Sequence, residues 1–216
     1  MIFYDEYDVP DDVADDFVQS SALGRLVTVG DETGPHIGVY PFVYEPGRID
    51  LHLNRADEQV ADLQTNRRCV FEVDDVLASI PSYWIDPENA TMATAYHRTV
   101  VFDCAATISG DADVLVAQQT RLMGRYQPEG SFRALSAGDP MYETMLGMLM
   151  SVHLDVTRRR AKFKIGQNRS PEVRAVVADH LRARGRPRDA DAARALDWTI
   201  DGGARPSAHP GHGETP

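Results

Sequence analysis

The sequence is poor in cysteine and has no long apolar run. Its two cysteines, Cys69 and Cys104, lie in strand-like apolar segments without a CxxC spacing, so neither a zinc site nor a disulfide framework is indicated. We expect both to be buried free thiols. No stretch reaches the roughly 18 apolar residues of a membrane helix, and residues 1–16 are acidic where a signal peptide would be basic. These absences predict a cytoplasmic protein without a membrane-spanning segment.

Several nucleotide-binding and catalytic motifs are absent as well. The chain contains no GxGxxG, GxxxxGKS/T, HExxH or GxSxG pattern. Such patterns supply glycines, metal ligands or a nucleophile at the spacing that the chemistry requires. Their absence leaves the Rossmann, P-loop, zinc-protease and serine-hydrolase classes without support.

The chain also lacks an overall positive charge. Its formal net charge is -11, which repels a polyanion and disfavours direct DNA binding. The charge is uneven, because residues 1–16 hold seven acids and no base, whereas residues 158–188 hold eleven Lys and Arg against two acids. A local anion site is therefore compatible with the second region.

Apolar residues make up 43% of the 216 residues, enough for one substantial core. The first part of the chain predicts a helix, an antiparallel meander, a second helix and a returning strand. The expected helices cover 11–20 and the region 55–66, and the expected strands cover 25–30, 35–44, 49–53 and 67–75.

The second part of the chain predicts more strands, two packing helices and a helical C-terminal region. The expected strands cover 77–84 and 95–108, with a hairpin-like pair over 151–157 and 160–166, and the expected helices cover 111–126, 139–150 and the region from about 170. Ser170 is the expected N-cap of the last helix and Gly185 its stop. We expect one domain over 1–200 and a disordered Gly- and Pro-rich tail over 201–216.

About seven strands with short turns and outer helices predict a mainly β, α+β fold: a closed or nearly closed antiparallel β-barrel with the helices outside. The order of the meander, the segment "HLNRADEQVADLQTNRRCVFEV" and a long strand resembles the FMN-binding split-barrel superfamily, which includes the pyridoxamine 5'-phosphate oxidases. The segment "YHRTVVFDCAATI" is similar to a strand of nitroimidazole-reductase-like members. These resemblances imply a split antiparallel β-barrel, an FMN cofactor, a homodimer and a small-molecule substrate.

The segment "KFKIGQNRSPEVRAVV" resembles the C-terminal signature of PaiB-type proteins, which are FMN-binding negative transcriptional regulators. Where that family has a Pro-Thr-Trp-Asn-Tyr motif, this chain has "MATAYH". The segment from His52 is also similar to the heme-dependent piperazate synthases, which join two nitrogens. That similarity implies heme b as an alternative cofactor, with His52 as its axial ligand.

An FMN site needs cations and donors for the phosphate and an apolar wall for the ring. Asn54 and Arg55 stand at the junction of an expected strand and helix, where free backbone N–H groups favour an anion, and Arg67 with Arg68 follows the same helix. His52 lies on the preceding strand. We expect His52, Asn54, Arg55 and Arg67 to contact the cofactor; the alternatives are solvated arginines and a core histidine.

A second set of polar residues lies in "RAKFKIGQNRSPEVR". Strand alternation places Lys162 and Lys164 on one face, and Gln167, Asn168 and Arg169 follow at the start of the helix. We expect Lys164 and this turn to lie at the cofactor or the dimer interface. The alternative is a polar turn whose amides cap the neighbouring backbone.

Trp84 is the expected wall of the planar ring, with a core aromatic as the alternative. His97 and Arg98 begin the long strand and are the expected substrate contacts, and no residue stands out as a catalytic acid or base. The sequence thus predicts an FMN-dependent oxidoreductase acting on a small molecule. A heme enzyme and a PaiB-like regulator are the alternatives.

Overall fold

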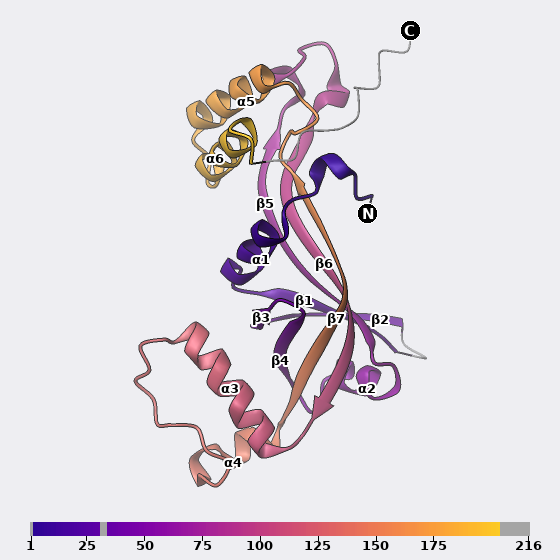
Figure 1. Ribbon diagram of the computed structural model, residues 1–216, viewed down its shortest axis with the longest axis vertical. Helices are drawn as coiled ribbons and strands as arrows, with labels where there is room; N and C mark the ends of the chain where they lie inside the picture. Colours follow the sequence, from indigo (N-terminus) through magenta and orange to yellow (C-terminus); the bar gives the residue numbers. More distant parts are fainter. Residues whose placement is uncertain (1, 31–33, 204–216) are drawn as a thin grey trace. The chain divides into compact units, whose positions relative to one another are not determined.

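The protein is described here by a computed structural model that covers residues 2–30 and 34–203. Seven strands form one sheet in the order β2-β1-β5-β6-β7-β4-β3 (Figure 1). The chain divides into two compact units, one of residues 15–73 and 101–159 and one of residues 1–14, 74–100 and 160–216. We call them the meander unit and the terminal unit. Because the units share long strands, this division does not decide whether residues 1–200 form one domain, and the single domain stays a prediction.

The meander unit contains the expected succession of short strands and helices. Its complete elements are β1 (Gly24–Gly30), β2 (Gly34–Tyr40), β3 (Val43–Glu45), β4 (Arg48–Asn54), α2 (Glu58–Thr65), α3 (Ala112–Tyr126) and α4 (Pro140–Gly147). The long strands β5 (Arg68–Ile80), β6 (Thr94–Ser109) and β7 (Leu149–Lys164) contribute residues to both units. Helix α1 (Asp11–Ser20) likewise contains residues of both.

The alternation along β1 explains which face of the sheet forms the core. Leu26 and Thr28 are buried, whereas Val27 and Val29 point to the opposite face. Leu26 pairs with Phe71 on β5, whose ring packs edge-on against Phe42 at 5.1 Å between centroids. The inner face of the meander unit is therefore a packed apolar core, and the outer face carries a second set of apolar side chains.

Side-chain caps fix where the helices begin. Asp57, Asp111, Asp139 and Ser170 each accept a backbone N–H in the first turn of the helix that follows. Helix α5 (Pro171–Arg184) ends at Gly185 in the left-handed conformation, as the sequence predicts. In the terminal unit α5 packs against α6 (Asp189–Ile200), and the short helices η1 (Asp5–Tyr7), η2 (Ser82–Trp84) and η3 (Ala90–Met92) complete the unit.

Three sequence predictions of strand boundaries are wrong. The expected hairpin over 151–166 is one continuous strand, β7, because no Gly, Pro or Asn interrupts Thr157 to Arg160. The polar residues there occupy exposed or half-buried strand positions. The strands expected over 67–75 and 77–84 merge into the single β5, which ends at Ile80, and Ser82–Trp84 form a short helix instead. The strand expected over 35–44 breaks into β2 and β3 at Pro41, which lacks the N–H that a strand donates.

No helix in the described ranges is long and apolar enough to cross a membrane. Most of the predicted tail over 201–216 lies outside the described residues.

Candidate functional site

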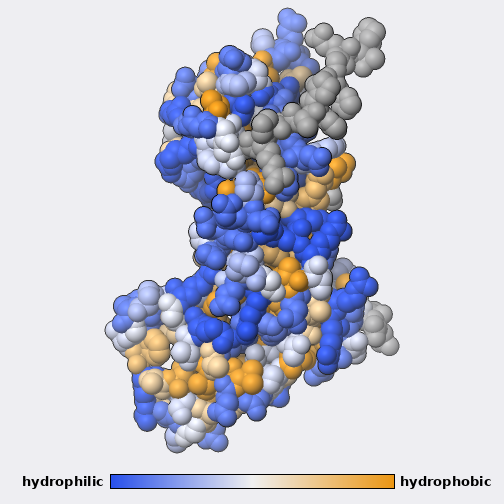
Figure 2. All heavy atoms as spheres, viewed as in Figure 1, coloured by the Kyte–Doolittle hydropathy of each residue, from blue (hydrophilic) through white to orange (hydrophobic). Residues whose placement is uncertain are grey.

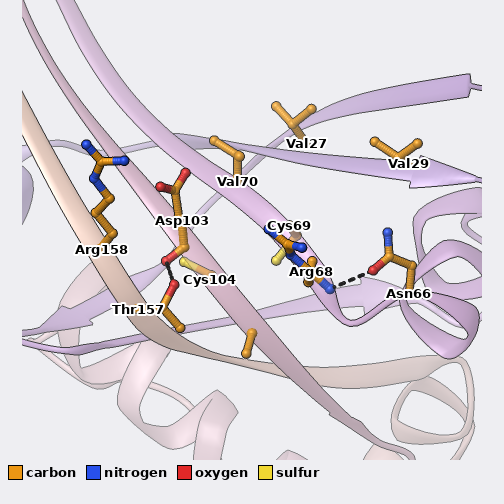
Figure 3. Close-up of a pocket in the computed structure, with 11 residues that line it drawn as sticks. Val27, Val29, Asn66, Arg68, Cys69, Val70, Asp103, Cys104, Thr157 and Arg158 are labelled. Carbon is orange, nitrogen blue, oxygen red and sulfur yellow. Dashed lines mark hydrogen bonds between the residues drawn. The ribbon is translucent and has the colours of Figure 1, made fainter. Parts of the chain in front are cut away.

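The outer face of the meander unit carries a hollow of about 720 Å³ (Figure 3). We call it the sheet-face hollow. Its apolar floor comes from β1, β5 and β6, where Val27 and Val70 pair directly and Ala105 lies on the neighbouring strand. The volume lies within the usual range of ligand sites, about 300 to 1,000 Å³.

Polar side chains surround this floor. Arg68 and Arg158 are exposed cations on β5 and β7, and Asp103 lies between these strands on β6. Thr157 donates its hydroxyl to the carbonyl oxygen of Asp103 at 2.9 Å, and the backbone N–H of Arg68 donates to Asn66 at 3.0 Å. The hollow therefore combines an apolar floor with two cations, a carboxylate and an amide.

The two cysteines line the same hollow and are buried free thiols, as predicted. Burial raises the pKa of Cys69 to about 12 and also raises the pKa of Cys104. Both sulfurs are thus protonated at neutral pH, which removes the thiolate that nucleophilic chemistry requires. Strand alternation places both side chains on the core face, opposite Val70 and Ala105, so they pack behind the floor.

His52 lies elsewhere in the meander unit, on β4, where it lines a pocket of about 320 Å³ beneath α3 and α4. Burial lowers the pKa of His52, so the imidazole is neutral at pH 7. Its Nδ1 is buried and has no hydrogen-bond partner within the described residues.

The junction between β4 and α2 is more self-contained than the sequence predicts. The N-terminus of α2 is capped by its own Asp57, and Asn54 accepts the N–H of Ala56 at 2.9 Å. Arg55 donates from Nε to the carbonyl of Gly147 at 3.1 Å and from Nη2 to that of Leu149 at 3.4 Å. These carbonyls end α4 and begin β7, so the cation stabilises a helix C-terminus. Arg67 is exposed and does not line the hollow.

The predicted basic turn belongs to the terminal unit and is closely bound to its own backbone. Gln167 accepts the N–H of Ile165 at 2.7 Å and donates to the carbonyl of Phe163 at 2.5 Å, which is the capping role named as the alternative. Lys164 donates to Thr94 at 2.7 Å, and Arg169 lies 3.1 Å from the sulfur of Met92. Asn168 is exposed.

The cations of this turn lie close enough to affect one another. Burial lowers the pKa of Lys164, and the charges of Lys162 and Arg169 lower it further. Burial and the same two lysines, Lys162 and Lys164, lower the pKa of His97. His97 and Lys164 therefore lie near each other in the terminal unit, and their predicted roles toward a substrate and a cofactor stay predictions.

Arg98 and Trp84 have structural partners within the terminal unit. The guanidinium of Arg98 lies 5.7 Å from the ring centroid of Phe163. Trp84 stacks on His180 at 5.0 Å and lies beneath the guanidinium of Arg184 at 4.7 Å, which matches the alternative of a packing aromatic.

The predicted site residues therefore fall into two sets. His52, Asn54, Arg55 and Arg67 belong to the meander unit, and the others belong to the terminal unit. The sequence points to Arg67 with Arg68 after α2, and of these two only Arg68 lines the hollow, since neighbouring residues of a strand face opposite sides. Arg158 and Asp103 in the hollow and Gln119 in the His52 pocket are residues that the sequence predictions leave out.

Comparison with solved structures gives the same fold at low sequence identity. A conserved hypothetical protein of Mycobacterium tuberculosis aligns with a TM-score of 0.57 and 21% identity over 76% of this chain and 91% of its own. An FAD- and heme-binding protein of Mycobacterium smegmatis gives 0.59 and 12% over 73% and 72%. A flavocytochrome of Azotobacter vinelandii gives 0.58 and 13% over 73% and 67%.

These likenesses identify the split-barrel fold predicted from the sequence. No curated protein matches the chain. A family model described as "Putative FMN-binding domain" matches residues 1–158, which include all of the meander unit except Arg159 and part of the terminal unit. The chain thus belongs to this family of FMN-binding split-barrel domains.

Proposed function

We propose that the protein is a flavoprotein that binds FMN in the sheet-face hollow and acts as an oxidoreductase on a small molecule. The observation that carries the proposal is the hollow itself, about 720 Å³ of concave sheet face with Arg68 and Arg158 beside an apolar floor. Family membership supports the choice of FMN over other ligands of similar size.

The residues of the hollow suit the separate parts of FMN. Arg68 and Arg158 supply the charge-assisted donors that a phosphate requires. Val27, Val70 and Ala105 supply an apolar surface for a planar ring, and Asp103 and Asn66 supply acceptors for its N–H edge. When bound, FMN supplies two-electron redox chemistry, whereas these side chains bind and orient it.

The same face supports a homodimer. Val29, Ile37 and Val39 are 49%, 67% and 53% exposed on adjacent strands β1 and β2. The register pairs Val27 with Ile37, which places the exposed residues on the same face as the hollow. A second copy of the chain would cover this apolar surface and exclude water from the flavin.

The absorption spectrum of the purified protein, before and after addition of FMN, tests the proposal. Flavin bands that remain with the protein through gel filtration support it. A Soret band would instead indicate the heme alternative, and a colourless protein that retains no FMN would favour the PaiB-like regulator. The last two results contradict the proposal.

A further inference from the structure

The pocket beneath α3 and α4 is separate from the sheet-face hollow and shares no lining residue with it. His52 on β4 and Gln119 on α3 form its polar part, and the wall includes Met123, Tyr142, Met145 and Leu146. Figure 2 shows apolar surface gathered over α3 and α4, at the lower left of the view. Its volume of about 320 Å³ is at the lower end of the range for ligand sites.

Two buried polar atoms in this pocket lack partners. Neither Nδ1 of His52 nor Nε2 of Gln119 has a hydrogen bond within the described part of the chain. A buried polar group left unpaired costs about 1 to 3 kcal/mol. Two such groups on different elements, lining one cavity, are the pattern expected where an occupant supplies the missing hydrogen bonds.

The remainder of the wall shows what the occupant must be like. Apart from His52 and Gln119, the only residue with a hydroxyl, amide or charged group among the six named is Tyr142, whose hydroxyl already donates to the carbonyl of Arg133. The volume is about ten times the share of one liquid water, about 30 Å³, and an apolar wall gives additional waters no partners. The occupant therefore needs an apolar body as well as a polar group.

The lining has no Lys, Arg, Asp or Glu, so a charged ligand would be buried without a counter-ion. The amide of Gln119 offers a donor, and a neutral imidazole Nδ1 can donate or accept. An amide or carbonyl group satisfies both. Met123 and Met145 are flexible side chains that can adapt to different apolar bodies.

We propose that this pocket is a binding site for a small uncharged molecule with an apolar body and a carbonyl or amide group that pairs with Gln119 and His52. The site is independent of the flavin.

Benzamide is the probe that tests the inference, with benzoate as its charged counterpart of the same shape. In saturation-transfer NMR and calorimetric titrations at pH 7, we expect benzamide to bind at least about tenfold more tightly than benzoate. Gln119→Leu should weaken benzamide about two- to tenfold, the effect of one neutral hydrogen bond. Equal binding of the two probes, or no binding of benzamide to a folded wild type, would overturn the proposal.

A matched pair of variants on α4 locates the binding. Met145 lines the pocket and is 53% exposed, so it lies at the mouth, whereas Met141 is 66% exposed and does not line it. Met145→Trp should abolish benzamide binding, and Met141→Trp should leave it unchanged. Equal effects of the two substitutions would place the probe elsewhere.

Two further titrations separate this inference from the cofactor. Benzamide binding is measured with and without added FMN. If the protein binds benzamide but not FMN, the proposed function is contradicted and the proposed ligand site at His52 is not. If it binds FMN but not benzamide, only the proposed ligand site is contradicted. A hemin titration with a Soret band that His52→Leu removes, and that benzamide does not inhibit, would overturn the proposal.

Discussion

Nδ1 of His36 lies 2.7 Å from Oδ2 of Asp62, which joins strand β2 to helix α2. The same carboxylate oxygen accepts the hydroxyl of Thr28 on β1 at 2.6 Å. Gln59, one turn earlier on α2, donates to the carbonyl of Leu26 at 3.0 Å. Helix α2 is therefore attached to the first hairpin by a buried polar network as well as by apolar packing.

This network makes stability depend on pH. The hydrogen bond to Asp62 raises the pKa of His36, burial opposes it, and the charges of Asp62 and Glu58 raise it further. A folded-state pKa above the unfolded value near 6.5 means that the stabilisation is fully present below about pH 6.5 and is lost as pH rises through the folded pKa.

We therefore expect His36→Gln to destabilise the protein more at about pH 5.5 than at about pH 8.5. Urea unfolding of wild type and variant at both pH values measures the difference. In an Asp62→Asn background the pH dependence of the His36→Gln effect should become smaller, because only Glu58 and the other nearby carboxylates then act on His36. A loss of stability that is the same at both pH values would show that the ion pair is not its cause.

A second prediction concerns Asp50, a buried carboxylate between β4, β7 and α3. Burial by itself raises the pKa of Asp50, but hydrogen bonds from Arg48 and His153 and the charge of Arg121 outweigh it, so the pKa lies below its usual value. Oδ1 lies 2.9 Å from Nδ1 of His153, and Oδ2 lies 2.9 Å from Arg121. This stabilisation is present above the usual carboxylate pKa and is lost as pH falls through the lowered one.

We expect Asp50→Asn to lower the free energy of unfolding at pH 7 by about 1 to 3 kcal/mol, the range for charge-assisted hydrogen bonds. Asp155→Asn is the control, because Asp155 also contacts His153, at 3.0 Å, but its side chain is 64% exposed. Its effect should stay within about 0.5 kcal/mol. Equal losses of unfolding free energy in the two variants would show that the buried Asp50 contributes no more to stability than the exposed Asp155.

Arg55→Ala tests the role of Arg55 at the end of α4. The guanidinium contacts the carbonyls of Gly147 and Leu149, so its removal should lower stability by about 0.5 to 1.5 kcal/mol and speed amide exchange in α4. Hydrogen exchange by mass spectrometry measures both. Unchanged exchange in α4, together with weaker FMN binding, would favour the phosphate role that the sequence predicts.

Gly166 provides a test of the turn in "KFKIGQNRS". Its φ is +79°, and a Cβ at this position would lie 2.6 Å from the hydroxyl of the buried Tyr96. Gly185 is also left-handed, with φ +62°, but a Cβ there has open space. Gly185→Ala should cost about 1 to 2 kcal/mol from the backbone alone, and Gly166→Ala clearly more. Thermal unfolding that ranks the two variants in the opposite order would contradict the crowding at Tyr96.

Much of the fold was predictable because local signals and packing agree. Asp11–Ser20, the α3 and α5 helices and their caps follow from apolar spacing and capping residues. The continuity of β7 was not predictable in this way, because three consecutive arginines at 158–160 interrupt the apolar alternation of the strand. Arg159 occupies the strand because it pairs with Asp15 at 2.5 Å, a partner 144 residues away.

The candidate site was predictable only in part, for the same physical reason. Periodicity identifies the strands, but not which neighbouring strand or helix lies beside a given residue. Arg68, Asp103 and Arg158 meet because β5, β6 and β7 are adjacent in the sheet. Gln119 lies on a helix face with no distinctive pattern, and only the fold brings it to His52. Trp84 and Gln167, in contrast, make contacts within the terminal unit that fit the alternatives given for them, and their cofactor roles stay predictions.

The central claim is that FMN binds in the sheet-face hollow, and a fluorescence titration of FMN against three forms of the protein tests it most directly. Arg68 lines the hollow and the adjacent Arg67 does not, so they form a matched pair. We expect FMN binding to wild type with quenching, an affinity lower by about 1 to 3 kcal/mol in Arg68→Ala, and a smaller change in Arg67→Ala. Absence of FMN binding to the wild type, or equal affinities of wild type and Arg68→Ala, would contradict the claim.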